Sequence, residues 1–347
     1  MPGPAGAALY LYRIARVGPP HAMSGRPSST ISGDAVVVRT LLALLLLSGV
    51  VRAAPAQAPD HAPGGQKEAD SLRARRQQGQ FAIGMSAWPT EWYCSGPMTA
   101  TMQQVHPREV LKRVQLAARC GMRLVLVPPR RLLTEGKMPE GVFSVQNAKR
   151  IIDMYAVELP PDTLRKYRAT ILGFNLADDY GCERCWGGSA ITQAQVAEWA
   201  AYARPRLPGL PLGVRVVPEW VARDPALAPL LDYAWAQYHT RKGDAKEFYD
   251  EAAETAEKLG LRVVMGVNVK DCYGVGTDPC TPADLVRYGK LALSHPASCA
   301  FINWRYDEGT WRRADIRRVW QGLVDEAKSR GAEECRRKGS GAAPARS

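Results

Sequence analysis

The sequence predicts an α/β fold, and within that class a (β/α)8 TIM barrel, on three observations. Short apolar runs rich in β-branched residues alternate with longer amphipathic stretches. The stretch that contains these patterns, residues 80–334, has the length of one such barrel, which is typically about 250 residues. Joints such as Cys120-Gly121-Met122 lead from a helical pattern directly into a strand pattern, as parallel strands with crossover helices require. An open doubly wound sheet is the second choice, since no glycine-rich phosphate loop follows the first strand.

Seven apolar runs are predicted to be strands of a buried parallel sheet, because both of their faces are apolar. The eighth strand of a complete barrel is expected around residues 141–145; without it the barrel would be incomplete or irregular. The seven predicted strands cover residues 81–87, 123–127, 170–176, 212–217, 233–237, 262–268 and 300–304.

Five amphipathic stretches are predicted to be helices between these strands. Val110, Leu111 and Val114 lie at helical spacing, and Gly121 after them suits a helix C-terminus. Thr192 can cap the N-terminus of another helix. The predicted helices cover residues 107–120, 192–203, 244–259, 282–293 and 314–328.

The segment 1–58 is predicted to be a signal peptide. The apolar run 41–51 suits a secretory h-region of roughly 7–15 residues and is shorter than the roughly 20 residues that span a membrane. An A-x-A cleavage pattern follows at residues 56–58, and Met23 is a candidate for the true start. We therefore expect a secreted or periplasmic protein with no stable membrane anchor after cleavage; an uncleaved single-pass anchor is the alternative.

The remaining chain divides into a flexible linker over 59–79, a barrel domain over 80–334 and a flexible basic tail over 335–347. The formal net charge of the whole sequence is +12, spread along the chain rather than concentrated in one patch. Because the sequence holds no nucleic-acid-binding motif and export argues against that partner, we expect no nucleic acid to bind.

Acidic and aromatic residues follow the predicted strands, at the end of the barrel where such folds collect their catalytic groups. Flat aromatic rings stack on sugar faces, and paired carboxylates can protonate a glycosidic oxygen while assisting attack at the sugar. The combination predicts a carbohydrate ligand or substrate, held by Trp88, Arg130, Trp186, Trp220, Tyr238, His239, Asn268, Trp304, Arg305 and Asp307.

Two carboxylates are predicted to be catalytic: Asp178 or Asp179 as one, and Glu219 as the other. Asp179 can instead cap a following helix, and Glu219 can be a first-turn acid that the helix dipole favours. Asp307 and Glu308 are the reserve candidates.

The polar binding candidates have ordinary structural alternatives as well. Tyr238 and His239 can bind a substrate hydroxyl or tune a carboxylate pKa, or the histidine can simply lie on the surface. Arg130 and Arg305 can hold an acidic sugar or pair with neighbouring carboxylates. The stacking platforms are predicted to be Trp88, Trp186, Trp220 and Trp304.

The run 171–181 (ILGFNLADDYG) resembles the strand-end carboxylate segment of glycoside-hydrolase-like TIM barrels, and 301–306 (FINWRY) is similar to their aromatic last strands. The resemblance covers most of residues 81–330 as architecture and assigns no specific family. It implies an acidic residue delivered into the cleft by a mid-barrel strand. The Asn-Glu pair of many such enzymes is replaced by Ala177-Asp178, so a non-catalytic carbohydrate-binding barrel is the alternative.

A metal-dependent sugar isomerase or epimerase is the third functional hypothesis for the same fold. Such a site would need several His, Asp and Glu side chains converging as ligands. Only His106, His239 and His295 lie within the predicted domain, and we expect no cofactor or resident metal.

Eight cysteines in an exported chain predict disulfides. Cys272 and Cys280 can close one Gly/Pro-rich loop, and Cys182 and Cys185 lie together in another. The alternative is a zinc site built from these two pairs as four thiolates. The spacing leaves open how the other four pair: Cys94, Cys120, Cys299 and Cys335.

Overall fold

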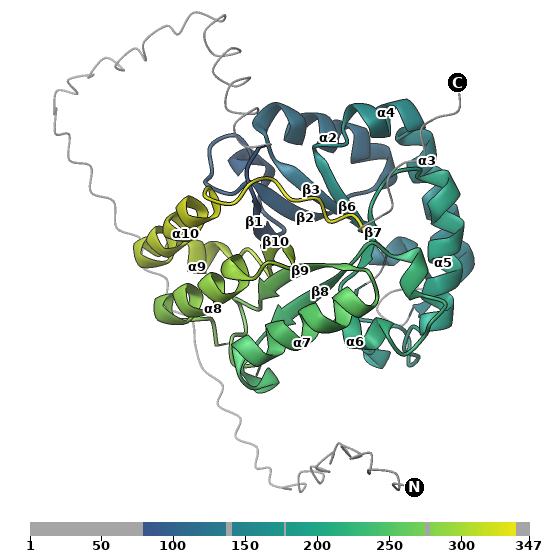
Figure 1. Cartoon of the computed structure of the whole chain (residues 1–347). Helices are drawn as coiled ribbons and strands as arrows, with labels where there is room; N and C mark the ends of the chain where they lie inside the picture. Colours follow the sequence, from purple (N-terminus) through teal and green to yellow (C-terminus); the bar gives the residue numbers. More distant parts are fainter. Residues whose placement is uncertain (1–78, 137–140, 177, 275–277, 338–347) are drawn as a thin grey trace, which may run out of the picture. The chain divides into compact units, whose positions relative to one another are not determined.

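The computed structural model describes residues 79–136, 141–176, 178–274 and 278–337. They form a closed barrel of eight parallel strands surrounded by helices (Figure 1), which confirms the predicted (β/α)8 TIM barrel. The predicted signal peptide, the linker up to residue 78 and the tail from residue 338 lie outside the described residues. In order around the barrel the strands are β1 (Ala82–Ser86), β2 (Ala100–Gln104), β3 (Arg123–Val127), β6 (Ile171–Asn175), β7 (Leu212–Val214), β8 (Tyr233–Tyr238), β9 (Arg262–Val267) and β10 (Ser298–Asn303).

The barrel is complete, but its eighth strand is β2 and not the segment expected around residues 141–145. That expectation is wrong, because β5 (Val142–Phe143) pairs antiparallel with β4 (Thr134–Glu135) in a separate two-stranded sheet. The β2 strand pairs in parallel with β1 on one side and with β3 on the other, so it closes the ring.

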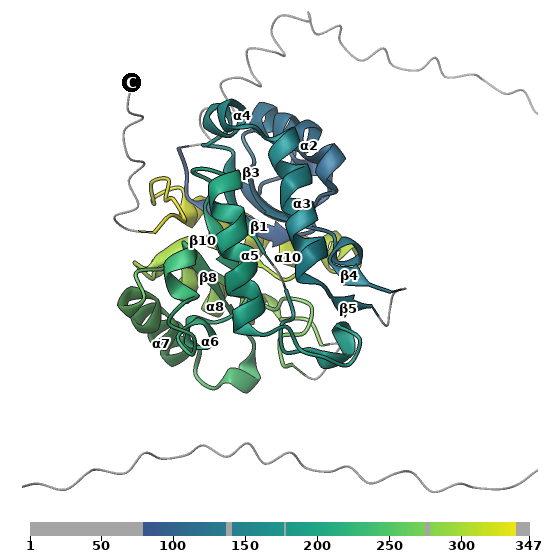
Figure 2. The same cartoon turned by 90° about the vertical axis from the view of Figure 1, so that its right-hand side faces the viewer.

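Helices cover the outside of the barrel, and all five predicted helices are present. Two features of the sequence define their ends as expected: Gly121 adopts a φ of 71° after the first helix, and Thr192 forms a capping box with Gln195. Figure 2 shows α2, α3 and α5 next to one another on one side. The helices are α2 (Pro107–Cys120), α3 (Val145–Glu158), α4 (Pro161–Lys166), α5 (Gln193–Arg206), α6 (Pro218–Val221), α7 (Ala245–Lys258), α8 (Pro282–Ser294), α9 (Glu308–Arg312) and α10 (Ala314–Ala327), with short 3-10 helices at η1 (Thr90–Trp92), η2 (Arg130–Leu132), η3 (Glu183–Cys185), η4 (Ala228–Leu230) and η5 (Thr240–Lys242).

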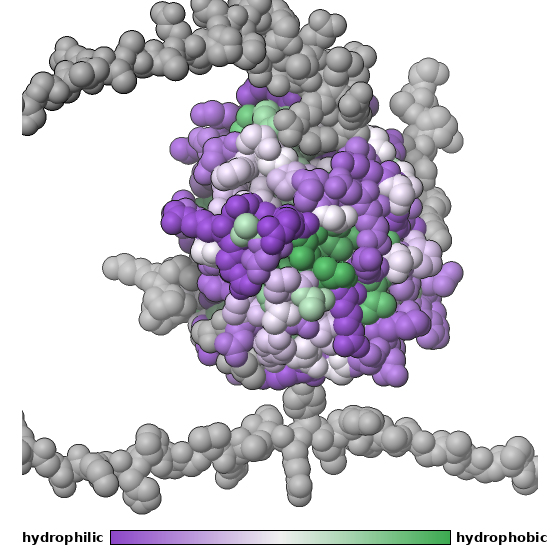
Figure 3. Space-filling model, turned by 90° about the vertical axis from the view of Figure 1, so that its left-hand side faces the viewer, coloured by the Kyte–Doolittle hydropathy of each residue, from purple (hydrophilic) through white to green (hydrophobic). Residues whose placement is uncertain are grey.

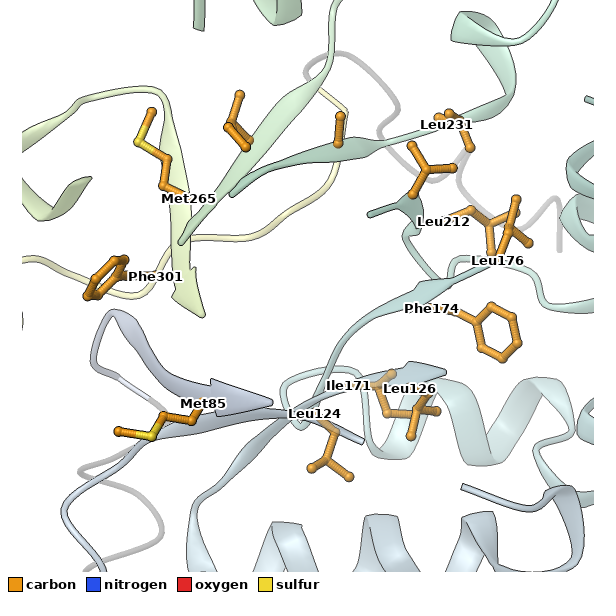
Figure 4. Packing of buried hydrophobic residues seen from close by; sticks show 14 of the residues in the cluster. Met85, Leu124, Leu126, Ile171, Phe174, Leu176, Leu212, Leu231, Met265 and Phe301 are labelled. Atoms are coloured by element: carbon orange, nitrogen blue, oxygen red, sulfur yellow. The ribbon is translucent and has the colours of Figure 1, made fainter. Parts of the chain in front are cut away.

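The outward faces of the strands form the core beneath these helices. Side chains of alternate strand residues point away from the barrel toward the helical layer (Figure 4), as the two-residue period of a strand requires. The cluster includes Met85, Leu124, Leu126, Ile171, Phe174, Leu176, Leu212, Leu231, Met265 and Phe301.

The inward faces fill the barrel with side chains. Tyr233 and Trp235, both from β8, are its two large rings and are buried. A side chain at Gly213 would overlap the Tyr233 ring, and one at Gly266 would overlap Trp235. The inward faces of the strands around them therefore carry smaller residues, so that these rings fit: Ala82, Ala100, Met102, Val125, Val127, Leu172, Val264, Ala300 and Ile302.

The end of the barrel at which the strands begin is covered by the last described residues (yellow in Figure 1). Cys335 forms a disulfide with Cys299 at the start of β10. The Arg337 guanidinium donates to the carbonyl oxygens of Ala228 and Leu259, each at 2.8 Å. Residues 335–337, which the sequence assigned to the tail, thus pack on the barrel.

Four disulfides join all eight cysteines: Cys94–Cys120, Cys182–Cys185, Cys272–Cys280 and Cys299–Cys335. The predicted disulfides are confirmed, including both pairings within single loops. The zinc alternative is wrong, because the four sulfurs it needs are bonded to one another. Such a disulfide content is typical of proteins that fold in an oxidising compartment.

The surface of the domain is mainly hydrophilic on the face shown in Figure 3, where an apolar area near the middle lies among charged and polar residues. Within the described ranges, every helix is too short or too polar to span a membrane.

Candidate active site at the carboxyl ends of the strands

Arg215 is the central side chain of the candidate site, and the sequence analysis did not predict it. It directly follows β7, two residues beyond Gly213, whose missing side chain would meet Tyr233 inside the barrel. The Arg215 side chain is only 10% exposed. Its Nε donates to Asp178 Oδ1, and its Nη2 lies 3.3 Å from Asp179 Oδ1. Both predicted carboxylates of the β6 loop are therefore held by one guanidinium.

Two tryptophans flank this guanidinium. The Arg215 guanidinium carbon lies 4.2 Å from the ring centroid of Trp304, which follows β10, and 5.5 Å from that of Trp235 on β8. A cation over an indole face is attracted by the ring electrons, and more strongly where water is excluded. Arg215 is thus fixed at the centre of the barrel mouth by residues from three strands.

Asp178 is a carboxyl group whose pKa this environment raises. Its side chain is 21% exposed, and its Oδ1 also accepts the backbone N–H of Asp179 at 2.8 Å. Burial raises the pKa of Asp178 to about 6, against the opposing effect of Arg215. Asp179, by contrast, has a half-exposed side chain and a φ of 53°.

Glu219 and Trp220 lie on the neighbouring loop, in the four-residue helix α6. Glu219 occupies its first turn, as the helix-dipole alternative predicted, and its buried Oε1 accepts no hydrogen bond from the described residues. Trp220 stacks on Tyr180 with 4.8 Å between the ring centroids. Burial raises the pKa of Tyr180 well above its usual value, and its hydroxyl has no partner in the described part of the chain.

Trp88 and Trp186 were predicted as stacking platforms, but each is only 1% exposed. Trp88 packs edge-on against Trp311 at 4.8 Å, and the Trp186 Nε1 donates to the Asp179 carbonyl oxygen at 2.9 Å. Arg130 lies over Trp186 at 4.8 Å. Because protein covers these two rings, Trp220 and Trp304 are the two predicted platforms that remain partly exposed.

Tyr238 does not point into the barrel mouth. It alternates with the inward Tyr233 and Trp235, so it faces the helical layer, where its hydroxyl donates to the Gly243 carbonyl oxygen at 2.7 Å. His239 follows at the strand end, and burial lowers its pKa, with Lys242 and Arg241 acting in the same direction. The imidazole is therefore neutral at pH 7.

The remaining candidate residues lie in the loops after β9 and β10, where most of them make structural contacts. Asn268 Oδ1 accepts the Asp271 N–H at 3.1 Å. Asp307 caps α9 by accepting the Thr310 N–H at 2.9 Å, and this contact lowers the pKa of Asp307. Arg305 is exposed, 5.7 Å from the Trp304 ring.

Glu308, the other reserve carboxylate, pairs with Arg312 one helical turn later at 2.5 Å. Within the described ranges, no group of three or more His, Cys, Asp and Glu side chains is arranged to hold a metal ion.

No family model and no curated protein matches the sequence. Among solved structures, the chain is similar to the Pseudomonas stutzeri endoglucanase Cel5A in complex with cellobiose, with a TM-score of 0.50 and 10% identity over 74% of this chain and 95% of that chain. A family 39 glycoside hydrolase from Bacteroides cellulosilyticus WH2 matches with a TM-score of 0.48 and 10% identity, over 73% of this chain and 64% of that chain.

An exo-β-1,4-mannosidase from Opitutaceae bacterium strain TAV5 matches with a TM-score of 0.47 and 12% identity, over 72% of this chain. The chain spans 59% of that mannosidase. At 10% identity the likeness to the endoglucanase shows the fold alone, which is a (β/α)8 barrel, and assigns no family.

Proposed function

We propose that this chain is an exported glycoside hydrolase that acts on a polysaccharide or glycan at the carboxyl ends of its strands. The observation that carries the proposal is the Asp178 carboxyl group, which is largely buried at the barrel mouth and has its pKa raised to about 6. A carboxyl group with such a pKa remains partly protonated at mildly acidic pH, as a general acid must. Trp304 and Trp220 supply partly exposed aromatic rings nearby.

In the proposed reaction, the protonated Asp178 gives its proton to the glycosidic oxygen as the bond from that oxygen to the anomeric carbon breaks. Glu219, whose Oε1 lacks a partner among the described residues, supplies the second carboxylate. It either attacks the anomeric carbon or takes a proton from the attacking water. Water is consumed in both cases, and the glycan is released as two shorter sugars.

Export is supported by two independent features. The segment 1–58 has the pattern of a signal peptide, and four disulfides stabilise the domain. An extracellular or periplasmic glycan is the substrate that fits this location.

The test is a screen of the purified protein against a panel of glycans, with Asp178→Asn, Asp179→Asn and Glu219→Gln compared with the wild type. We expect D178N to lower the hydrolysis rate about 100-fold or more, because it removes the general acid. Asp162→Asn, on the exposed surface of α4, is the matched control and should leave the rate unchanged. Hydrolysis that survives all three changes at the mouth would refute the proposed site.

A carbohydrate-binding barrel without turnover is the second candidate. It is favoured by the single guanidinium of Arg215, which contacts both Asp178 and Asp179 and opposes protonation of Asp178. Glycan binding by the wild type, with no product released from any glycan of the panel, would support this candidate over the hydrolase.

A further inference from the structure

Arg215 contacts Asp178 in a way that distinguishes the two oxygens of its carboxyl group. Asp178 Oδ1 accepts two hydrogen bonds, from Arg215 Nε and from the backbone N–H of Asp179. No hydrogen bond to Asp178 Oδ2 occurs within the described residues. An oxygen that already accepts two N–H groups is a poor place for a proton, so protonation is directed to Oδ2.

We infer that Arg215 is a positioning residue, which holds Asp178 by Oδ1 so that Oδ2 carries the proton delivered to the substrate. The inference rests on the proposed function for its catalytic consequence, although the contact geometry stands without it. A positioning role requires that Arg215 itself be fixed. Its side chain is nine-tenths buried, and its guanidinium lies over the ring of Trp304.

The charged and titratable groups that act on Asp178 come from two loops. Arg215 at the end of β7 favours the carboxylate form, whereas Asp179 disfavours it by repulsion. Tyr180, on the same loop as Asp179, interacts with Asp178 as a neutral phenol, because burial keeps its own pKa high. Removing Arg215 therefore raises the pKa of Asp178, and removing the Asp179 charge lowers it.

The experiment measures the pH dependence of kcat/KM for the wild type, Arg215→Gln, Arg215→Lys and Asp179→Asn. The activity of a general acid is lost as pH rises through its pKa. The alkaline limb of the profile is the part in which kcat/KM falls as the pH rises. We expect this limb in R215Q to move to higher pH by about one unit or more, since an opposite charge at this distance shifts a carboxyl pKa by about 1–3 units. R215K should lie between R215Q and the wild type.

Asp179→Asn should move the alkaline limb in the opposite direction, to lower pH. Asn tolerates the positive φ at this position, and the backbone N–H to Asp178 is kept, so the variant is expected to fold. This second variant keeps the inference testable if R215Q does not fold.

The matched control is Arg204→Gln, because Arg204 also pairs with a buried aspartate, Asp232, at 2.6 Å. That pair lies at the end where the strands begin, so R204Q should reduce stability without moving the alkaline limb. Alkaline limbs that stay in place in both R215Q and D179N would overturn the inference, even with glycan hydrolysis established.

A wild type that hydrolyses no glycan would refute the proposed function while leaving the inference open to a direct measurement. Carbon-13 NMR titration of the Asp178 carboxyl group gives its pKa without any substrate. An upward shift in R215Q and a downward shift in D179N would support the inference. Unchanged titration in both would overturn it.

Discussion

The phenol ring of Tyr233 occupies the space that a side chain at Gly213 would need. A β-carbon built on Gly213 would overlap three atoms of the ring, and one on Gly173 would overlap it from the next strand. The Tyr233 hydroxyl donates to Asn175 Oδ1 at 2.9 Å, so the ring cannot turn aside without losing this bond. One aromatic side chain thus determines the residue type on two neighbouring strands.

Gly213→Ala should lower the free energy of unfolding by about 1–3 kcal/mol, the usual cost of forcing extra volume into a packed core. The matched control is Gly322→Ala, which lies within α10 with no atom near its added methyl group and should be stabilising by about 0.5–1 kcal/mol. Chemical denaturation followed by circular dichroism measures both. Equal stability of G213A and the wild type would show that the ring does not fill this space.

The stability of the fold should depend on pH through Asp178. Because its folded pKa of about 6 lies above its ordinary value of 3.8, the folded state holds a proton that the unfolded state releases between these pH values. The stabilisation of the folded state by this proton is fully present below pH 4 and is lost as the pH rises through 6. Relative to Asp178→Asn, the wild type should lose about 3 kcal/mol of unfolding free energy between pH 4 and pH 8. A stability difference that does not change with pH would contradict the raised pKa.

The four disulfides should contribute unequally to stability. Cys299 and Cys335 are separated by 36 positions and Cys182 and Cys185 by only 3, and closing a longer loop restricts the unfolded chain more. Replacing both cysteines by serine should cost about 4 kcal/mol for the first pair and about 2 kcal/mol for the second. Urea denaturation of the two double variants measures both losses of unfolding free energy. A larger loss for the Cys182–Cys185 variant than for the Cys299–Cys335 variant would contradict the prediction.

Trp186 should behave as a packing residue. Its ring lies among Phe143, Arg130 and the Asp179 carbonyl group, so Trp186→Ala should cost about 3–5 kcal/mol of unfolding free energy. Trp92, which is 39% exposed, is the matched control, and W92A should change stability by less than about 1 kcal/mol. Thermal unfolding of the two variants measures this difference in stability. A W186A protein as stable as the wild type would contradict the packing role and favour the predicted role of Trp186 as a stacking platform for a sugar.

The barrel could be predicted from the sequence because seven strands carry their apolar residues in short, isolated runs. The eighth, β2, does not. Its Thr101 and Gln103 are polar yet buried, since the Thr101 hydroxyl donates to Met85 O at 2.7 Å and Gln103 Nε2 donates to Trp88 O at 2.5 Å. Polar side chains that find backbone partners inside a fold give no apolar pattern to detect.

The candidate site could be predicted only in part. Asp178 and Asp179 follow an obvious strand, but Arg215 lies in the apolar-looking run LGVRVV, where it reads as an ordinary strand residue. The available signal was its spacing of two residues from Gly213, which places both on one face if the extended backbone of β7 continues to Arg215. That this face points inward, toward a carboxylate from β6, depends on the closure of the barrel and cannot be read from one strand.

The Cys299–Cys335 bond has a consequence for a chain that is cut shortly before residue 335. Proteolysis breaks a peptide bond and leaves the disulfide intact, so the C-terminal segment stays covalently attached where the β10 strand begins. The Arg337 contacts that cover this end of the barrel lie on the attached segment. A cut copy therefore migrates as one species until a reducing agent separates the two pieces.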